Sequence, residues 1–191
     1  MDKTALEQAI KSFGSLPEVD VEKGLSLFQP KRYLKNEYLI QEGRTCDWIA
    51  FIQSGIVRNF YTSSKAEEVT YCMTFQNHFI SAYSSFISGE KTFENIHALT
   101  DLEVWIISKK DYQDLIQSSM EWLRFSNYFA EQSYILMEKR LLGLQMESAD
   151  KRYAELLKNQ PEILRNIPLK YIASYLGITQ RHLSRLRSKI M

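Results

Sequence analysis

Cationic and hydrogen-bonding side chains gather in the stretch IPLKYIASYLGITQRHLSRLRSKIM at residues 167–191. Apolar residues recur there at helical spacing on both sides of a Gly-Ile-Thr break. The side chains expected to point outward after the break are Gln180, Arg181, Ser184, Arg185 and Arg187. Arginine can form two hydrogen bonds with guanine and glutamine two with adenine, so such a helix is suited to reading base edges in the major groove. Lys170 and Lys189 are better placed to contact phosphates.

The residues that would position these outward-pointing side chains fit two short helices joined by a tight turn. Pro168 suits the start of a helix over residues 169–176, and the small Ala173 lets a second helix cross closely. Gly177 supplies the left-handed residue that a sharp turn needs, and Thr179 can cap the second helix. This pattern predicts a helix-turn-helix. The alternative is a pair of helices that serves only for packing.

The charge distribution singles out the same region. Residues 151–191 hold nine Lys and Arg and two Asp and Glu, a net charge of +7. Residues 1–150 hold fifteen and twenty-one, a net charge of −6. An acidic body with a basic C-terminal region indicates that only this region meets a polyanion. The alternative is a basic helix that is merely solvated.

The composition is that of an ordinary folded protein, with 45% hydrophobic and 25% charged residues in a chain of 191. No apolar run approaches the ~18 residues of a membrane span. The first residues lack the apolar stretch of a secretory signal. Two cysteines cannot form a disulfide framework or hold an iron–sulfur cluster alone. We therefore expect a cytoplasmic protein with no membrane partner and no cofactor.

Residues 31–108 have the pattern of short strands separated by turns, after an amphipathic helix over residues 3–13. The runs rich in aromatic and β-branched residues are YLI at 38–40, WIAFI at 48–52, IVRNFY at 56–61, VTYCM at 69–73 and VWII at 104–107. Short strands at this spacing predict a β-sandwich or barrel.

A long helix with two apolar faces is predicted after the strands. One face is a seam with the 4-3 spacing of a coiled coil, formed by Leu123, Asn127, Ala130, Tyr134, Met137, Leu141 and Leu144. The other face holds Trp122, Phe125, Phe129, Gln132 and Leu136. We interpret the seam as the contact with a second copy, because a polar Asn127 can set the register between two helices. The second face would then pack on the β region. The alternative is a helix buried wholly within one chain.

The order of these parts resembles that of the Crp/Fnr transcription regulators. The resemblance is most specific at FISAYSSF (79–86), ALTDLEVWIISKKDY (98–112) and IASYLGITQRHLSRLR (172–187). It implies an α+β fold with three parts. These are an antiparallel β-roll or jelly roll of the cyclic-nucleotide-binding type in residues 1–118, a dimerisation helix in 119–146, and a helix-turn-helix domain in 147–191. It also implies a homodimeric DNA-binding regulator with double-stranded DNA and RNA polymerase as partners.

The chain departs from family members that bind cyclic AMP. Those members carry Gly-Glu, which binds the ribose, where this chain has Ser81-Ala82. They carry an Arg, which pairs with the cyclic phosphate, where it has Thr92. Because burying a phosphate without a cation is costly, cyclic AMP is not expected to bind tightly. The remaining candidates for an effector pocket are Phe79, Ser81, Ala82, Tyr83, Ser84, Ser85, Phe86, Thr92, Phe93 and Glu94. They either line a pocket for another effector, of unknown identity, or fill the cavity themselves.

The C-terminal part also departs from the family. PEILRNIPLK stands where a β-hairpin often precedes the motif, and no β-wing is expected after it. Members that bind the best-known operator carry Arg, Glu and Arg at the recognition positions, whereas this chain has Gln180, Arg181 and Arg185. The operator sequence should therefore differ.

Other functions find less support in the sequence. There is no Gly-rich phosphate loop and no G-x-S-x-G nucleophile motif, and the three histidines have no metal-ligand spacing, so an enzyme is not expected. A haem-sensing variant would need an axial ligand such as His78 or Cys72, and nothing favours that role. Two alternatives stay open: a regulator that needs no effector, and a small-molecule sensor that acts through protein partners.

Overall fold

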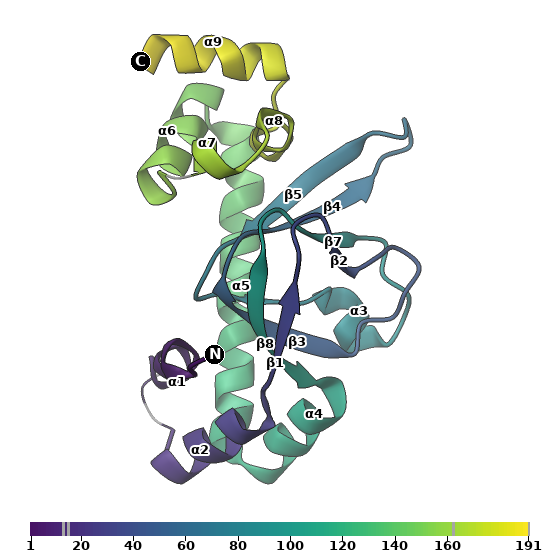
Figure 1. Ribbon diagram of the computed structural model, residues 1–191, viewed down its shortest axis with the longest axis vertical. Coiled ribbons are helices and arrows are strands. Elements are labelled where there is room, and N and C mark those ends of the chain that lie inside the picture. Colours follow the sequence, from purple (N-terminus) through teal and green to yellow (C-terminus); the bar gives the residue numbers. More distant parts are fainter. Residues whose placement is uncertain (13, 15, 162, 191) are drawn as a thin grey trace. The chain divides into compact units, whose positions relative to one another are not determined.

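The computed structural model (Figure 1) describes residues 1–191 apart from 13, 15, 162 and 191, and the side chains of residues 189 and 190 are also outside the description. The helices are α1 (Thr4–Lys11), α2 (Glu18–Leu27), α3 (Tyr83–Ser88), α4 (Lys109–Ser118), α5 (Met120–Met146), α6 (Ala149–Asn159), α7 (Ile163–Asn166), α8 (Leu169–Leu176) and α9 (Gln180–Ile190). The strands are β1 (Gln29–Tyr33), β2 (Tyr38–Ile40), β3 (Trp48–Ser54), β4 (Val57–Thr62), β5 (Glu68–Thr74), β6 (Phe79–Ile80), β7 (Asn95–Ala98) and β8 (Leu102–Ser108). The predicted α+β fold is confirmed.

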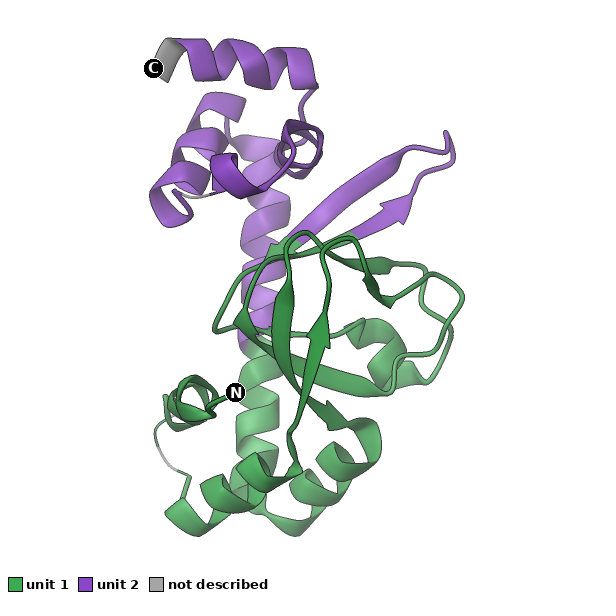
Figure 2. Ribbon diagram, viewed as in Figure 1, with its two compact units in different colours: residues 1–59, 73–131 green, residues 60–72, 132–191 purple. Residues whose placement is uncertain are grey.

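The chain divides into two compact units (Figure 2). Unit 1 consists of residues 1–59 and 73–131, and unit 2 of residues 60–72 and 132–191. The boundaries pass through β4, β5 and α5, so each of these three elements contributes residues to both units.

Two four-stranded sheets form the β-roll, in the orders β1-β8-β3-β6 and β2-β7-β4-β5. In the first sheet, β8 pairs antiparallel with β1 and β3, and Ala50 lies opposite Ile106. Phe51, Ile52 and Val104 are fully buried in this region. The five strands predicted from the sequence are present as β2, β3, β4, β5 and β8.

The sequence gives little sign of α2, because a glycine inside a helix reads as a breaker. The structure explains Gly24: a Cβ there would lie 2.1 Å from Cζ2 of Trp122, so only glycine permits this contact. The indole Nε1 of Trp122 donates a hydrogen bond of 3.0 Å to the carbonyl of Asp20. The close approach of Trp122 to Gly24, together with this hydrogen bond, therefore holds the start of α5 against α2.

Unit 2 contains its own apolar core. Its fully buried side chains belong to α6, α8 and α9 and include Tyr153, Ile172, Ala173, Leu176, Leu183 and Leu186. Ser148 caps α6, as predicted, because its Oγ accepts a hydrogen bond of 3.3 Å from the backbone N–H of Lys151. The guanidinium of Arg152 donates to the carbonyl of Leu176 at 2.9 Å and to the carbonyl of Glu147. This one side chain thus satisfies carbonyls at the ends of α8 and α5.

Candidate nucleic-acid interface and effector cradle

Helices α8 and α9 form a helix-turn-helix, and local signals define its turn. Gly177 follows α8 with φ of +68°, in the left-handed region, and the N–H of Ile178 donates to the carbonyl of Ala173 at 3.0 Å. Thr179 precedes α9, and its Oγ1 accepts a hydrogen bond of 3.2 Å from the N–H of His182. Gly177 and Thr179 therefore take the turn and cap roles that the sequence predicts.

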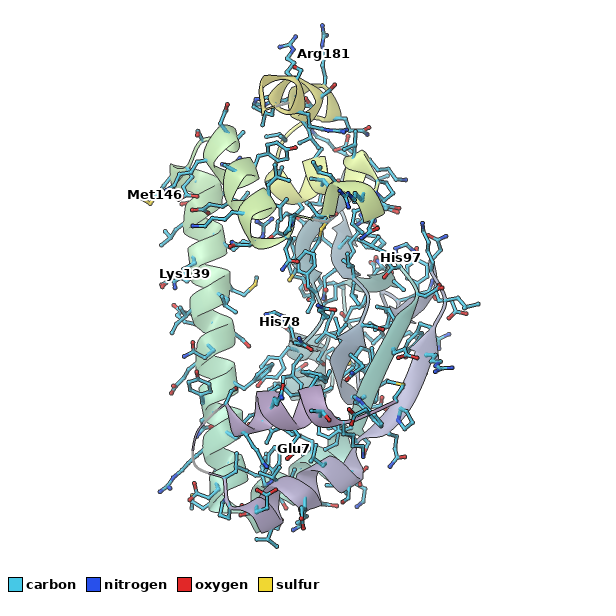
Figure 3. All side chains as sticks on the ribbon, turned by 60° about the vertical axis from the view of Figure 1, so that its left-hand side comes forward. Glu7, His78, His97, Lys139, Met146 and Arg181 are labelled. Atoms are coloured by element: carbon cyan, nitrogen blue, oxygen red, sulfur yellow. The ribbon has the colours of Figure 1, made fainter. Side chains whose placement is uncertain are left out.

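One face of α9 is polar and cationic. Leu183 and Leu186 are buried, whereas the exposed side chains are Gln180, Arg181, Ser184 and Arg185. Figure 3 shows Arg181 projecting from α9 away from the other helices of unit 2. Within the described part of the chain, no carboxylate lies within ion-pair distance of Arg181 or Arg185. Both guanidinium groups are thus available to an external acceptor.

The other predicted DNA-contacting cations have different surroundings. Arg187 is half-buried near Tyr153, whose pKa is raised by burial and partly lowered by the charge of Arg187. Lys170 is exposed on the first turn of α8, with its Nζ 4.7 Å from the centre of the Tyr171 ring. The side chain of Lys189 lies outside the described residues. Lys170 is thus an exposed cation on the first helix of the motif.

The predicted seam runs along α5 and is largely open to solvent in the single chain. Its exposed members are Leu123, Asn127, Tyr134, Met137, Leu141 and Leu144, and Ala130 is half-buried. On the second face, Trp122 and Phe125 are buried, as predicted, and the ring of Phe129 lies 5.4 Å from that of Phe79. The prediction of a buried stripe is wrong for Leu136, which is 62% exposed.

The ten candidates for an effector pocket, here called the effector cradle, include two serines whose hydroxyls bind the protein itself. The Oγ of Ser81 donates to the carbonyl of Trp48 at 2.8 Å. The Oγ of Ser85 accepts from the N–H of Cys46 at 2.9 Å and donates to the carbonyl of Glu90 at 2.5 Å. These two serines therefore stabilise the loops around α3.

A buried polar cluster lies beside Thr92. The Oγ1 of Thr92 accepts a hydrogen bond of 3.1 Å from the N–H of Glu94, and both side chains are buried. Glu94 Oε2 accepts a hydrogen bond of 2.8 Å from Nδ2 of Asn59 on β4. Arg58, the preceding residue of β4, is 1% exposed. The interior of the β-roll thus holds both a carboxylate, two residues after Thr92, and a guanidinium on β4.

The aromatic candidates of the cradle face α5 and α4. The rings of Phe79 and Tyr83 lie 5.4 and 6.5 Å from Phe129, and Phe86 lies 5.6 Å from Tyr112. Burial raises the pKa of Tyr83. Ala82 is buried, whereas Ser84 and Phe93 are exposed. The structure therefore does not bring the ten candidates together around one pocket.

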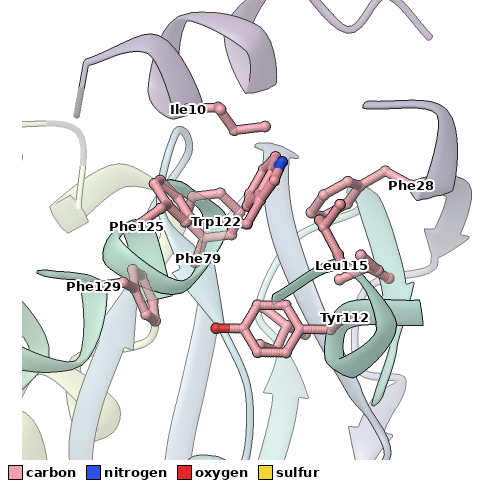
Figure 4. Close-up of a pocket in the computed structure, with 10 residues that line it drawn as sticks. Ile10, Phe28, Phe79, Tyr112, Leu115, Trp122, Phe125 and Phe129 are labelled. Carbon is pink, nitrogen blue, oxygen red and sulfur yellow. The ribbon is translucent and has the colours of Figure 1, made fainter. Parts of the chain in front are cut away.

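A small apolar cavity lies among the aromatic side chains of unit 1 (Figure 4). It has a volume of about 20 Å³ and is lined by Ile10, Phe28, Ile49, Phe79, Ile107, Tyr112, Leu115, Trp122, Phe125 and Phe129. This volume is near that of a single water molecule, and an apolar cavity of this kind stays dry. It offers no room for a nucleotide.

Two further features are absent from the described part of the chain. It contains no group of three or more His, Cys, Asp or Glu side chains that could hold a metal ion. It also contains no helix long and apolar enough to cross a membrane.

Comparison with known proteins gives a match to one domain family and to several solved structures. Residues 30–119 match the cyclic nucleotide-binding domain family. No curated protein sequence matches the chain. The chain has the fold of solved Crp/Fnr regulators, and the predicted resemblance to that family is confirmed at the level of the fold.

Three solved structures illustrate this likeness. FixK2 from Bradyrhizobium japonicum is 17% identical, with a TM-score of 0.74 over 85% of this chain and 84% of the other. A regulator of the Crp/Fnr family from Eubacterium rectale is 18% identical, with a TM-score of 0.72 over 94% and 85%. The c-di-GMP responsive regulator CLP from Xanthomonas campestris is 16% identical, with a TM-score of 0.64 over 91% of each chain. At identities of 16% to 18%, the likeness to these structures establishes the fold alone.

Proposed function

We propose that the chain is a dimeric, sequence-specific DNA-binding transcription regulator of Crp/Fnr type. In this proposal residues 1–118 form the regulatory β-roll, residues 119–146 the dimerisation helix and residues 147–191 the DNA-binding domain. The observation that carries it is the exposed cationic face of α9, placed on the second helix of a helix-turn-helix. DNA and RNA polymerase are the partners, and the cytoplasm is the place of action.

The predicted DNA-contacting side chains would make two kinds of contact, with base edges and with phosphates. Gln180, Arg181 and Arg185 lie exposed on its N-terminal half, where a recognition helix contacts base edges. Ser184 lies on the same exposed face. Lys170 and Lys189 serve the phosphates, which give affinity without sequence. In a parallel dimer two α9 helices would enter successive major grooves about 34 Å apart, so the operator is roughly palindromic.

Selection of bound duplexes from a random DNA library tests the proposal. The expected product is a roughly palindromic site, bound far more tightly than random DNA. Recovery of no preferred sequence would contradict it, and would favour a sensor that acts through protein partners.

For the β-roll we propose an effector other than cyclic AMP. The existence of a c-di-GMP responsive regulator with this fold supports the idea that such a domain can serve another ligand. A second candidate is a regulator that needs no effector, which is favoured by the internal hydrogen bonds of Ser81, Ser85 and Glu94. Operator affinity measured with and without a cell metabolite extract distinguishes the two, because only the first responds.

A further inference from the structure

The hydroxyl of Ser174 on α8 binds the first half of β5 in the β4–β5 hairpin. Its Oγ accepts a hydrogen bond of 2.9 Å from the N–H of Thr70 and donates one of 3.4 Å to the carbonyl of Glu68. Both partners belong to β5, the outermost strand of its sheet. One serine thus binds two alternate residues of a strand edge, as a neighbouring strand would.

Arg140 of α5 holds the same two elements. Its Nε donates to the carbonyl of Tyr71 in the hairpin at 2.7 Å, and its terminal nitrogen donates to the carbonyl of Tyr175 in α8. The guanidinium carbon lies 3.7 Å from the centre of the Tyr175 ring. Burial lowers the pKa of Arg140 and raises that of Tyr175, which agrees with a desolvated contact. Hairpin, dimerisation helix and helix-turn-helix therefore meet at one side chain.

The strands of the hairpin continue into the β-roll. Residues 57–59 of β4 and residues 73–74 of β5 belong to unit 1, and the rest of both strands to unit 2. Asn59, the partner of Glu94 in the cradle, comes directly before the hairpin residues of unit 2. Strand β4 thus runs without a break from the cradle into the hairpin.

We propose that the hairpin (residues 60–72), Arg140 and Ser174 form a clasp that holds the helix-turn-helix in its DNA-binding orientation. The inference rests on the proposed function as a DNA-binding regulator. An unclasped domain would lose orientational freedom on binding, and this loss weakens affinity for a site that must meet two α9 helices at a fixed spacing. Ser174 and Arg140 are positioning residues, because they act on α9 through α8.

Ser174→Ala and Arg140→Ala test the clasp in the full-length chain. Hydrogen exchange of the Thr70 amide reports the contact, and operator affinity reports its consequence. We expect both variants to speed exchange at Thr70 and to weaken operator binding by roughly threefold to tenfold. Ser174→Thr, which keeps the hydroxyl, should restore both properties.

Two matched variants control for the loss of a hydroxyl or a charge. Ser64→Ala removes an exposed hydroxyl from the hairpin itself, and Lys139→Ala removes an exposed cation from the position next to Arg140 (Figure 3). Both should leave exchange and affinity unchanged. Faster exchange with unchanged or tighter operator binding would overturn the clasp, as would unchanged exchange. If the wild type selects no operator, the proposed function fails, whereas the exchange measurement still decides whether the contact exists.

Discussion

The side-chain amide of Asn59 donates a hydrogen bond of 2.8 Å to the carboxylate of Glu94, although the two residues lie 35 positions apart. Both are buried in the β-roll, and Thr92 lies beside them. A buried carboxylate is tolerated only when hydrogen bonds or charges compensate its lost hydration. The pair therefore contributes to the stability of the cradle itself.

Glu94→Ala should destabilise the fold, because it leaves the buried amide of Asn59 without this acceptor. We expect a loss of about 1–3 kcal/mol in the free energy of unfolding, measured by urea denaturation. Glu90→Ala removes an exposed carboxylate from the preceding turn and should have little effect. Equal losses in the two variants would show that the buried hydrogen bond is not important.

Cyclic AMP should bind weakly or not at all. Thr92 offers no cation to the cyclic phosphate, and the nearby carboxylate of Glu94 would repel it. Titration calorimetry with the purified protein is the measurement. A dissociation constant in the micromolar range or tighter would overturn this prediction.

Leu141→Asp should dissociate the dimer. Leu141 is 57% exposed in the single chain and lies near the C-terminal end of the predicted seam, so a charge there would be buried between two helices of the proposed dimer. Sedimentation at micromolar concentration should show a shift from dimer to monomer. Leu136→Asp is the matched control, because Leu136 is similarly exposed on another face of α5. A monomeric wild type, or dissociation by both variants alike, would contradict the seam.

Arg185→Ala should cost about 1–3 kcal/mol of operator affinity and relax the preference at one base pair of each half-site. Its exposed guanidinium has no carboxylate partner among the described residues, so it is available to a base. Lys170→Ala should instead weaken operator and random DNA alike and lower the salt dependence of binding. Binding isotherms at several salt concentrations distinguish the two. Equal weakening of both DNAs by Arg185→Ala would rule out base reading.

Short-range signals made the C-terminal motif predictable from sequence. Gly177 and Thr179 act through the backbone within five residues of themselves, so their roles follow from residue type and spacing. The β-strands were equally visible, because their runs of aromatic and β-branched residues fit a buried pleated surface. The periodicity of α5 predicted the burial of Trp122 and Phe125 but not the exposure of Leu136.

The tertiary structure decided what depends on partners distant in the chain. Phe79 and Tyr83 looked like cradle residues because they flank Ser81 in sequence, but they lie beside Phe129 of α5. Gly24 is typical of a helix breaker in the sequence, but in the structure it lies within α2. The absence of a Cβ there leaves room for the ring of Trp122.

The contact of Ser174 with Thr70 spans 104 positions, and that of Asn59 with Glu94 spans 35. No local pattern signals either one. Side-chain hydrogen bonds of this kind need two segments at a specific separation and angle, and only the packed chain fixes that geometry. The sequence by itself therefore determined most of the strands, the long helix and the helix-turn-helix with its exposed cationic face. Folding determined which buried groups surround Thr92 and which strand edge meets the helix-turn-helix.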